Sequence, residues 1–318
     1  MKGKIETFYF FAISIASKAV TYLLLIAFAN LFTVIDYGEA AFALSAFTLL
    51  TVLSQIGVPT LLIPYLVKRN GHEKSVFWFL VVLTAISTAV GLIICTQFTW
   101  ITPLILSLPF LLFYGIGRAI LRAEHKHHLT QITDTLSVIF AFLFVILFSG
   151  YGKVGIMLAY AASNIIISLI MIYWTTDQFK KIATPFEFNI KIIRNYISKA
   201  VLVFVVFISL DVLNKMDSLI LGAFSSFENV AHYNISYSIA TIIYAIPISI
   251  SMFLLTRSAE IEDEQMSKNV FTRCTRISFS LSLLAAVALN ALIFLITRLF
   301  FPKYAGTELF VAILSCAA

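Results

Sequence analysis

Apolar runs of about 20 residues recur along the whole chain, and only short polar segments separate them. A helix rises about 1.5 Å per residue, so a run of this length crosses the roughly 30 Å hydrocarbon core of a bilayer. Nine runs predict membrane-spanning helices: 8–33, 40–66, 76–96, 100–119, 133–149, 154–176, 200–223, 233–255 and 277–297. A tenth run begins near Ala305 and has only about 14 residues, or roughly 21 Å of helix. The pattern predicts an all-α, polytopic transmembrane helix bundle whose last span is cut short.

Composition supports a membrane protein, because 60% of the residues are hydrophobic, only 12% are charged, and the 30 Phe outnumber the 22 Lys and Arg together. The predicted outer segments between the spans, such as TVIDYGE, are too short to fold a catalytic domain. The sequence has no Walker loop, HExxH or GxSxG motif, so it gives no support to hydrolytic or ATP-driven chemistry. We therefore predict a protein that is not an enzyme.

The residues that could bind a metal are not spaced for it. Cys95, Cys274 and Cys316 are far apart, which fits neither a disulfide framework nor a zinc site. The segment HKHH, with histidines at positions 125, 127 and 128, lies beside Arg122 and is typical of a solvated basic loop. We expect neither a metal nor a cofactor.

Basic residues are distributed unevenly between the two sides of the predicted bundle. With a cytoplasmic N-terminus and alternating sides, most of the 22 Lys and Arg fall in inside segments, whereas Lys153, Arg298 and Lys303 fall outside. Lys18 and Lys215 lie within spans. Basic residues gather in cytoplasmic loops because of the way in which helices insert. The asymmetry predicts a cytoplasmic N-terminus and accounts for the net charge of +6 without a nucleic-acid partner.

The longest inside segment, residues 177–199, divides the predicted spans into two lobes. The first lobe, residues 1–184, has six helices, and the second, residues 185–318, is truncated after about four. Within the dividing segment, apolar residues alternate with charged ones, namely Phe186, Phe188, Ile190, Ile193 and Ile197. This pattern predicts a short helix that lies in the membrane interface.

Polar residues repeat at the same spacing in the first and seventh predicted spans. Each set occupies positions i, i+3, i+4 and i+7, which form one stripe on a helix. The sets are Ser14, Ser17, Lys18 and Thr21 in the first span, and Asp211, Asn214, Lys215 and Ser218 in the seventh. The segments that follow also match, with Tyr37 corresponding to Tyr233. Both spans enter from the same side, so the matches predict two pseudo-symmetric lobes related by a parallel repeat of six helices.

The charges in these spans need an explanation, because one charge at the centre of a membrane helix costs about 2.5 to 3.5 kcal/mol. In one interpretation, Asp211 and Lys215 form an i, i+4 pair that neutralises itself and serves only packing. That pair does not account for Lys18, which has no acidic neighbour on its own predicted helix. In the other interpretation, the two stripes line a wet cavity between the lobes. Asp217 lies about 120° from its stripe and can face a neighbouring helix instead.

Three segments carry a family resemblance: LLLIAFANLFTVIDYGEAAFALSAFTLLTVLSQIGVPTLLIPYLVKR, YGIGRAILRAEHK and NKMDSLILGAFSSFENVAHYNISYSIATIIYAIPISISMFL. They resemble the polysaccharide exporters, which are the lipid-linked oligosaccharide flippases of the multidrug, oligosaccharidyl-lipid and polysaccharide exporter superfamily. The resemblance implies a V-shaped pair of six-helix lobes, alternating access, and a cationic cavity for the diphosphate of an undecaprenyl-linked glycan. Lys18 and Lys215 fit the cationic role, and Asp217 matches the Asp of a family pattern that reads DSLILG in this chain.

We therefore expect a flippase that moves a lipid-linked oligosaccharide, an undecaprenyl-diphosphate glycan, across the bacterial cytoplasmic membrane for synthesis of a surface polysaccharide such as lipopolysaccharide or exopolysaccharide. The expected substrate-binding residues are Lys18, Lys215, Asn214, Ser17 and Thr21, and the expected ion-coupling residues are Asp211 and Asp217. The expected partners are the lipid-linked oligosaccharide, membrane lipids, and the glycan polymerase with other assembly proteins. The alternatives are a cation-coupled multidrug exporter of the same superfamily, a membrane enzyme of glycan assembly and a structural protein.

Overall fold

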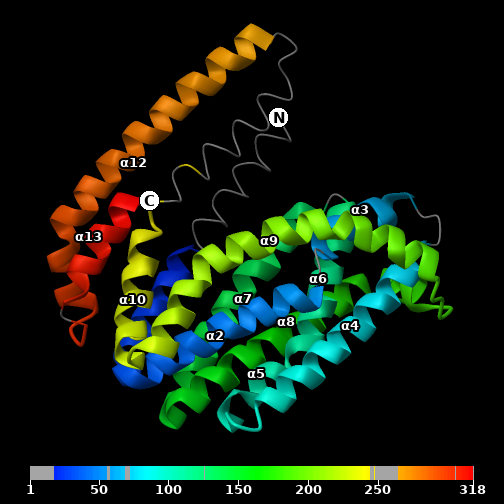
Figure 1. The fold of residues 1–318 in the computed structure, drawn as a ribbon, viewed down its shortest axis with the longest axis horizontal. Coiled ribbons are helices and arrows are strands. Elements are labelled where there is room, and N and C mark those ends of the chain that lie inside the picture. The colour runs from blue at the N-terminus through cyan, green and yellow to red at the C-terminus, as the bar shows by residue number, and fades with distance from the viewer. Residues whose placement is uncertain are drawn as a thin grey trace.

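A computed structural model describes residues 18–55, 58–68, 72–124, 126–243, 247, 264–304 and 306–317. Every regular element in these ranges is helical, as the sequence predicts (Figure 1). The main helices are Lys18–Leu31, α2 (Val34–Gln55), α3 (Val58–Lys68), α4 (His72–Ile94), α5 (Thr102–Leu106), α6 (Leu108–Ala123), α7 (His127–Leu147), α8 (Gly152–Ala183), α9 (Ile190–Phe224), α10 (Phe227–Ala240), α12 (Glu264–Phe300) and α13 (Thr307–Ala317). Short 3₁₀ helices, Thr99–Ile101 and Ser149–Tyr151, precede α5 and α8.

Six of the described helical segments are long and apolar enough to cross a membrane, or seven if the bent helix α9 is one span. The predicted spans 8–33 and 233–255 fall partly outside the described residues, and their described parts are the Lys18–Leu31 helix and α10. The expectation of an all-α, polytopic bundle is therefore confirmed.

Two predicted elements differ from the structure. The predicted span 40–66 is divided into α2 and α3. Pro59 is the second residue of α3, a position where its missing N–H removes no helical hydrogen bond, so a new helix starts there readily. The prediction of a separate interfacial helix within residues 177–199 is wrong, because α9 starts at Ile190 and continues to Phe224, with a bend of 59° between residues 190–206 and 211–224.

The start of α9 explains this continuity. The side chain of Asn189 caps the helix by accepting hydrogen bonds from the backbone N–H groups of Lys191 and Ile192. No Gly or Pro follows until Gly222, so nothing in the sequence ends the helix between the amphipathic part and the apolar part.

Two apolar clusters form the core, towards opposite ends of the long helices. Helix α8 contributes Ile156, near its start, to the first cluster and Phe179, near its end, to the second. The first cluster joins residues of both predicted lobes, such as Phe28 with Tyr304. Among the described residues, the second cluster receives only the start of α9 from the second lobe. The two predicted lobes are therefore packed together mainly at one end.

Among the described helices, α2 and α10 make the most extensive contact between the predicted lobes, and Figure 1 shows α2 (blue) starting at the foot of α10 (yellow). A Cβ atom added to Gly38 would lie 1.7 Å from the carbonyl oxygen of Phe227, so a glycine is needed where α2 meets the start of α10. Beside this contact, the Tyr37 hydroxyl donates a hydrogen bond to Asn234 Oδ1 at 3.0 Å. Helix α12, by contrast, has few buried side chains among those described, and Figure 1 shows it reaching away from the bundle.

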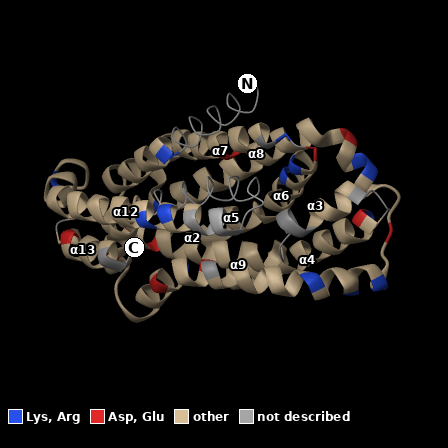
Figure 2. Ribbon diagram, turned by 90° about the horizontal axis from the view of Figure 1, so that it is seen from above, with Lys and Arg blue, Asp and Glu red and all other residues tan. Residues whose placement is uncertain are grey.

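Charged residues gather at one end of the bundle. Figure 2 shows many of them where α3 and α6 end and where α4 and α9 begin. The sequence analysis predicts this end to be cytoplasmic, and the end at which the lobes are packed together to face outside.

Candidate functional site

The polar stripe of α9 begins where the bend in the helix ends. Asp211 and Lys215 are both half-buried, Asn214 is exposed and Ser218 is buried. The ion pairs among the described residues are Arg118 with Asp134, Lys126 with Glu124, and Lys153 with Glu39. Asp211 and Lys215 therefore form no salt bridge, although their charges still attract each other across one turn of α9.

Two tyrosines of α10 bind polar side chains of α9. The Tyr237 hydroxyl donates to Asn214 Oδ1 at 2.6 Å, and the Tyr233 hydroxyl donates to Asp217 Oδ2. The two tyrosine rings stack with their centroids 6.1 Å apart. Asp217 thus faces a neighbouring helix, and α9 and α10 are joined by two parallel polar contacts. The repeat pattern pairs Tyr233 with Tyr37 but does not indicate that either tyrosine of α10 binds the stripe.

Gly222, the glycine of the DSLILG pattern, has a packing role. A Cβ atom added there would lie 2.2 Å from Cδ2 of Phe42, so the glycine lets α2 approach the last turn of α9. This contact fixes the outer half of α9, including Asp217, against the first lobe.

The structure describes only part of the matching stripe in the first span. Lys18 and Thr21 are exposed at the start of the Lys18–Leu31 helix, whereas Ser14 and Ser17 lie outside the described residues. No ion pair among the described residues involves Lys18. Among the described residues, no hydrogen-bonding partner is shared by Lys18 and Lys215.

A second charged group lies between α6 and α7, and the sequence analysis did not single it out as a site. Arg118 and Asp134 form an ion pair at 3.1 Å, with 27% and 30% of their side chains exposed. The Tyr114 hydroxyl donates a hydrogen bond to the other carboxylate oxygen of Asp134, and the Arg118 guanidinium lies over the Tyr114 ring, 5.6 Å from its centroid. The sequence feature that could have revealed this site is the presence of Arg118 and Asp134 in two successive apolar runs.

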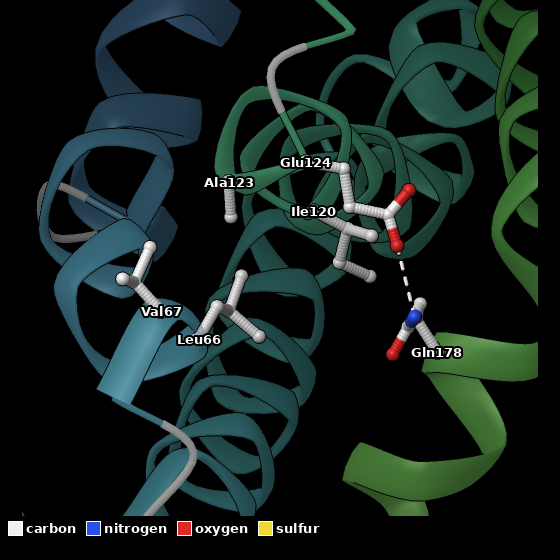
Figure 3. Close-up of a pocket in the computed structure, with 6 residues that line it drawn as sticks. All are labelled: Leu66, Val67, Ile120, Ala123, Glu124 and Gln178. Carbon is white, nitrogen blue, oxygen red and sulfur yellow. Dashed lines mark hydrogen bonds between the residues drawn. The ribbon is translucent and has the colours of Figure 1, made fainter.

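Two cavities lie within the first lobe. One, of about 260 Å³, lies between α2, α5, α6 and α8, and its polar lining residues are Thr48, Thr51, Tyr160 and Asn164. The other, of about 150 Å³, lies at the predicted cytoplasmic end beside Leu66 and Glu124 (Figure 3). There the Gln178 amide donates a hydrogen bond to Glu124 at 2.8 Å. Neither of these two cavities is lined by the polar stripe of α9.

Solved transporter structures share this fold. An inward-facing multidrug resistance MATE transporter of the MOP superfamily aligns with a TM-score of 0.67 and 15% identity, over 94% of this chain and 76% of that chain. An outward-facing MATE transporter aligns with a TM-score of 0.52 and 13% identity, over 97% and 77% of the two chains. A MATE structure in complex with MaL6 has a TM-score of 0.59 and 16% identity, over 96% and 78%.

Sequence comparison identifies the family. No curated protein matches the chain. The family model of polysaccharide biosynthesis proteins matches residues 5–262, which is most of the sequence. Since this match extends from the first predicted span to the end of the eighth, the chain belongs to the polysaccharide biosynthesis protein family, and it has the fold of MATE transporters.

Proposed function

We propose that this protein is a flippase that carries a lipid-linked oligosaccharide, an undecaprenyl-diphosphate glycan, across the bacterial cytoplasmic membrane. Membership of the polysaccharide biosynthesis family supports the choice of a glycan as cargo. The fold supports alternating access, since MATE transporters in inward-facing and outward-facing conformations share it. In this proposal no covalent chemistry takes place, the N-terminus is cytoplasmic, and a glycan polymerase receives the product.

The observation that carries the proposal is the position of Lys215. It is half-buried in an apolar helix and has no ion pair among the described residues, although Asp211 precedes it by one turn. A cation in a membrane helix that lacks a salt bridge is costly and is retained where it serves a function. A diphosphate is a suitable counter-ion, because it cannot enter hydrocarbon without groups that replace its lost water.

The remaining substrate-binding residues of the proposal belong to the predicted first and seventh spans. Lys18, Ser17 and Thr21 belong to the first span and Asn214 to α9. A lysine suits a moving cargo because its ammonium is a flexible point charge, whereas the arginine fork favours one fixed geometry. In this arrangement the two lysines neutralise the diphosphate while the lipid tail stays in the bilayer.

The test replaces the lysines in the chromosomal gene. We expect Lys215→Ala and Lys18→Ala to lower the amount of surface polysaccharide by about tenfold, because each loses a charge contact to the cargo. Lys215→Arg should restore part of the export, because it keeps the charge. The measurements are surface polysaccharide, accumulated lipid-linked glycan and the amount of the protein in the membrane.

Lys199→Ala is the matched control, since Lys199 is an exposed lysine near the start of the same helix. It should export normally. Normal export by Lys215→Ala at normal abundance would refute the charge role. Recovery of export in a double variant, Asp211→Ala with Lys215→Ala, would show that the two residues act as a structural pair.

A second candidate function is cation-coupled multidrug export, and the multidrug resistance MATE transporters with this fold favour it. Here we propose Asp211 and Asp217 as ion-coupling residues, because a carboxylate within a membrane helix can carry a proton across a conformational change. Asp217→Asn and Asp211→Asn should each reduce the dependence of transport on the proton gradient. Drug efflux that survives when glycan export is lost would favour this candidate over the flippase.

A further inference from the structure

Two helix ends from opposite halves of the chain meet where the predicted lobes are packed together. The first is the end of the Lys18–Leu31 helix, and the second is the end of α12 with the loop that follows it. Asn30 Nδ2 donates a hydrogen bond to the carbonyl oxygen of Phe300 at 3.0 Å. In the other direction, Lys303 Nζ donates to the carbonyl oxygens of Asn30 at 2.8 Å and Phe32 at 3.2 Å.

These four residues, Asn30, Phe32, Phe300 and Lys303, form a reciprocal cap. The last four carbonyl groups of a helix have no partner within that helix and carry partial negative charge. A lysine or an amide N–H satisfies them well. Each helix end supplies a donor to the other. Asn30 Nδ2 also donates to the Ile26 carbonyl oxygen of its own helix at 2.9 Å. Only its bond to Phe300 and the two bonds of Lys303 therefore require the ends to be together.

Buried aromatic residues lie beneath the reciprocal cap. Phe301 and Tyr304, which flank Lys303, are 4% and 0% exposed and pack in one cluster with Phe28 and Phe32. The Tyr37 ring, from the start of α2, packs edge to face on Tyr304, with 6.3 Å between the centroids. The contact between the halves is therefore a packed interface with a buried apolar centre and an exposed polar rim.

The reciprocal cap is suited to opening and closing. Asn30 and Lys303 are exposed, so water can replace their hydrogen bonds when the two halves separate. The carbonyl groups concerned lie at helix ends, so their release does not break the hydrogen bonds within either helix. At the opposite end of the bundle, the described core receives only the start of α9 from the second half. The two halves can therefore separate at the end with the reciprocal cap without first breaking an extensive contact at the opposite end.

We propose that the reciprocal cap is a latch that holds the predicted outer end of the protein closed and must be released before the protein opens on that side. The latch acts on the equilibrium between closed and open forms, and it does not depend on the nature of the cargo. The loss of one charge-assisted contact at an exposed site is expected to shift such an equilibrium by about tenfold.

The experiment measures the distance across the latched end directly. Spin labels are placed at Ile35 and Leu309, which are 56% and 68% exposed and lie in the first turns of α2 and α13. Pulsed electron paramagnetic resonance then gives the distance distribution of the purified protein in nanodiscs. Lys303→Ala should increase the population of the separated form about tenfold, and Lys303→Arg should restore the closed form.

Arg298→Ala is the matched control. Arg298 is a cation at the end of the same helix, and its guanidinium lies over the Phe294 ring on α12 itself, 5.0 Å from the centroid. It should leave the distance distribution unchanged, and an effect equal to that of Lys303→Ala would overturn the latch. Asn30→Ala removes the other half of the reciprocal cap and should act like Lys303→Ala. Unchanged distributions in both Asn30→Ala and Lys303→Ala would also overturn it.

Discussion

Charged residues lie within apolar helices in two regions of this protein, and the two regions differ in the partners that surround these charges. Between α6 and α7, the carboxylate of Asp134 accepts hydrogen bonds from both Arg118 and Tyr114. On α9, Lys215 and Asp211 are half-buried one turn apart, and no ion pair among the described residues includes either of them. The same residue types therefore form a salt bridge in one region, whereas in the other they attract each other only at longer range.

The difference separates charges that stabilise the fold from charges that cost stability. A partly buried carboxylate with a guanidinium and a hydroxyl donor has replaced most of the water that it lost on folding. A half-buried lysine that lacks a salt bridge has replaced less of the water that it lost. We infer that the α6 and α7 group holds two helices together, and that the α9 charges are available for binding.

The largest expected effect comes from breaking the paired group. Arg118→Met leaves the Asp134 carboxylate without its cation, and we expect a loss of about 2 to 3 kcal/mol of stability. Thermal unfolding in detergent, followed by size-exclusion chromatography, measures the change. A double variant, Arg118→Met with Asp134→Leu, should recover most of the loss, because no unpaired carboxylate remains. An unchanged unfolding temperature in the single variant would mean that the Arg118–Asp134 pair, like the α9 charges, does not stabilise the fold.

The next effect has the opposite sign. Lys215→Met removes a half-buried cation that has no salt bridge to a described residue, so we expect the unfolding temperature to stay constant or to rise by the equivalent of about 1 kcal/mol. The same assay applies, and Lys199→Met on the exposed start of α9 should cause no change. A decrease as large as that in Arg118→Met would mean that Lys215 is a structural residue.

The last effect, also smaller than that of Arg118→Met, concerns the two contacts between α9 and α10. Tyr233→Phe removes the hydrogen bond to the Asp217 carboxylate, and we expect a loss of about 1 to 2 kcal/mol. Tyr237→Phe removes the bond to the neutral Asn214 side chain and should cost about 1 kcal/mol or less. Thermal unfolding of the two variants side by side tests this order. A larger loss in Tyr237→Phe would contradict the view that Asp217 is the stronger acceptor.

The sequence predicted features that depend on local properties. The length of an apolar run decides whether a helix can cross a bilayer, and the cost of inserting charge makes a residue such as Lys215 conspicuous in any apolar window. The helical fold and most helix positions followed from these properties. Predictions about boundaries were less accurate, as in the division of the span 40–66 at Pro59 and in the continuous helix α9. Whether an amphipathic segment ends before the next span depends on its packing, which hydrophobic periodicity does not report.

Only the tertiary structure decided which polar groups have partners. Asp134 meets Arg118 because α6 and α7 are adjacent, whereas Asp211 and Lys215, at the spacing that favours pairing on one helix, do not form an ion pair. Asn30 and Lys303 are 273 positions apart and share hydrogen bonds because two helix ends meet. The cost of a polar group in a membrane is a property of its own segment, so the sequence reveals it. This cost is reduced only if a distant segment places a partner beside the polar group. The packing of the helices decides which segment that is.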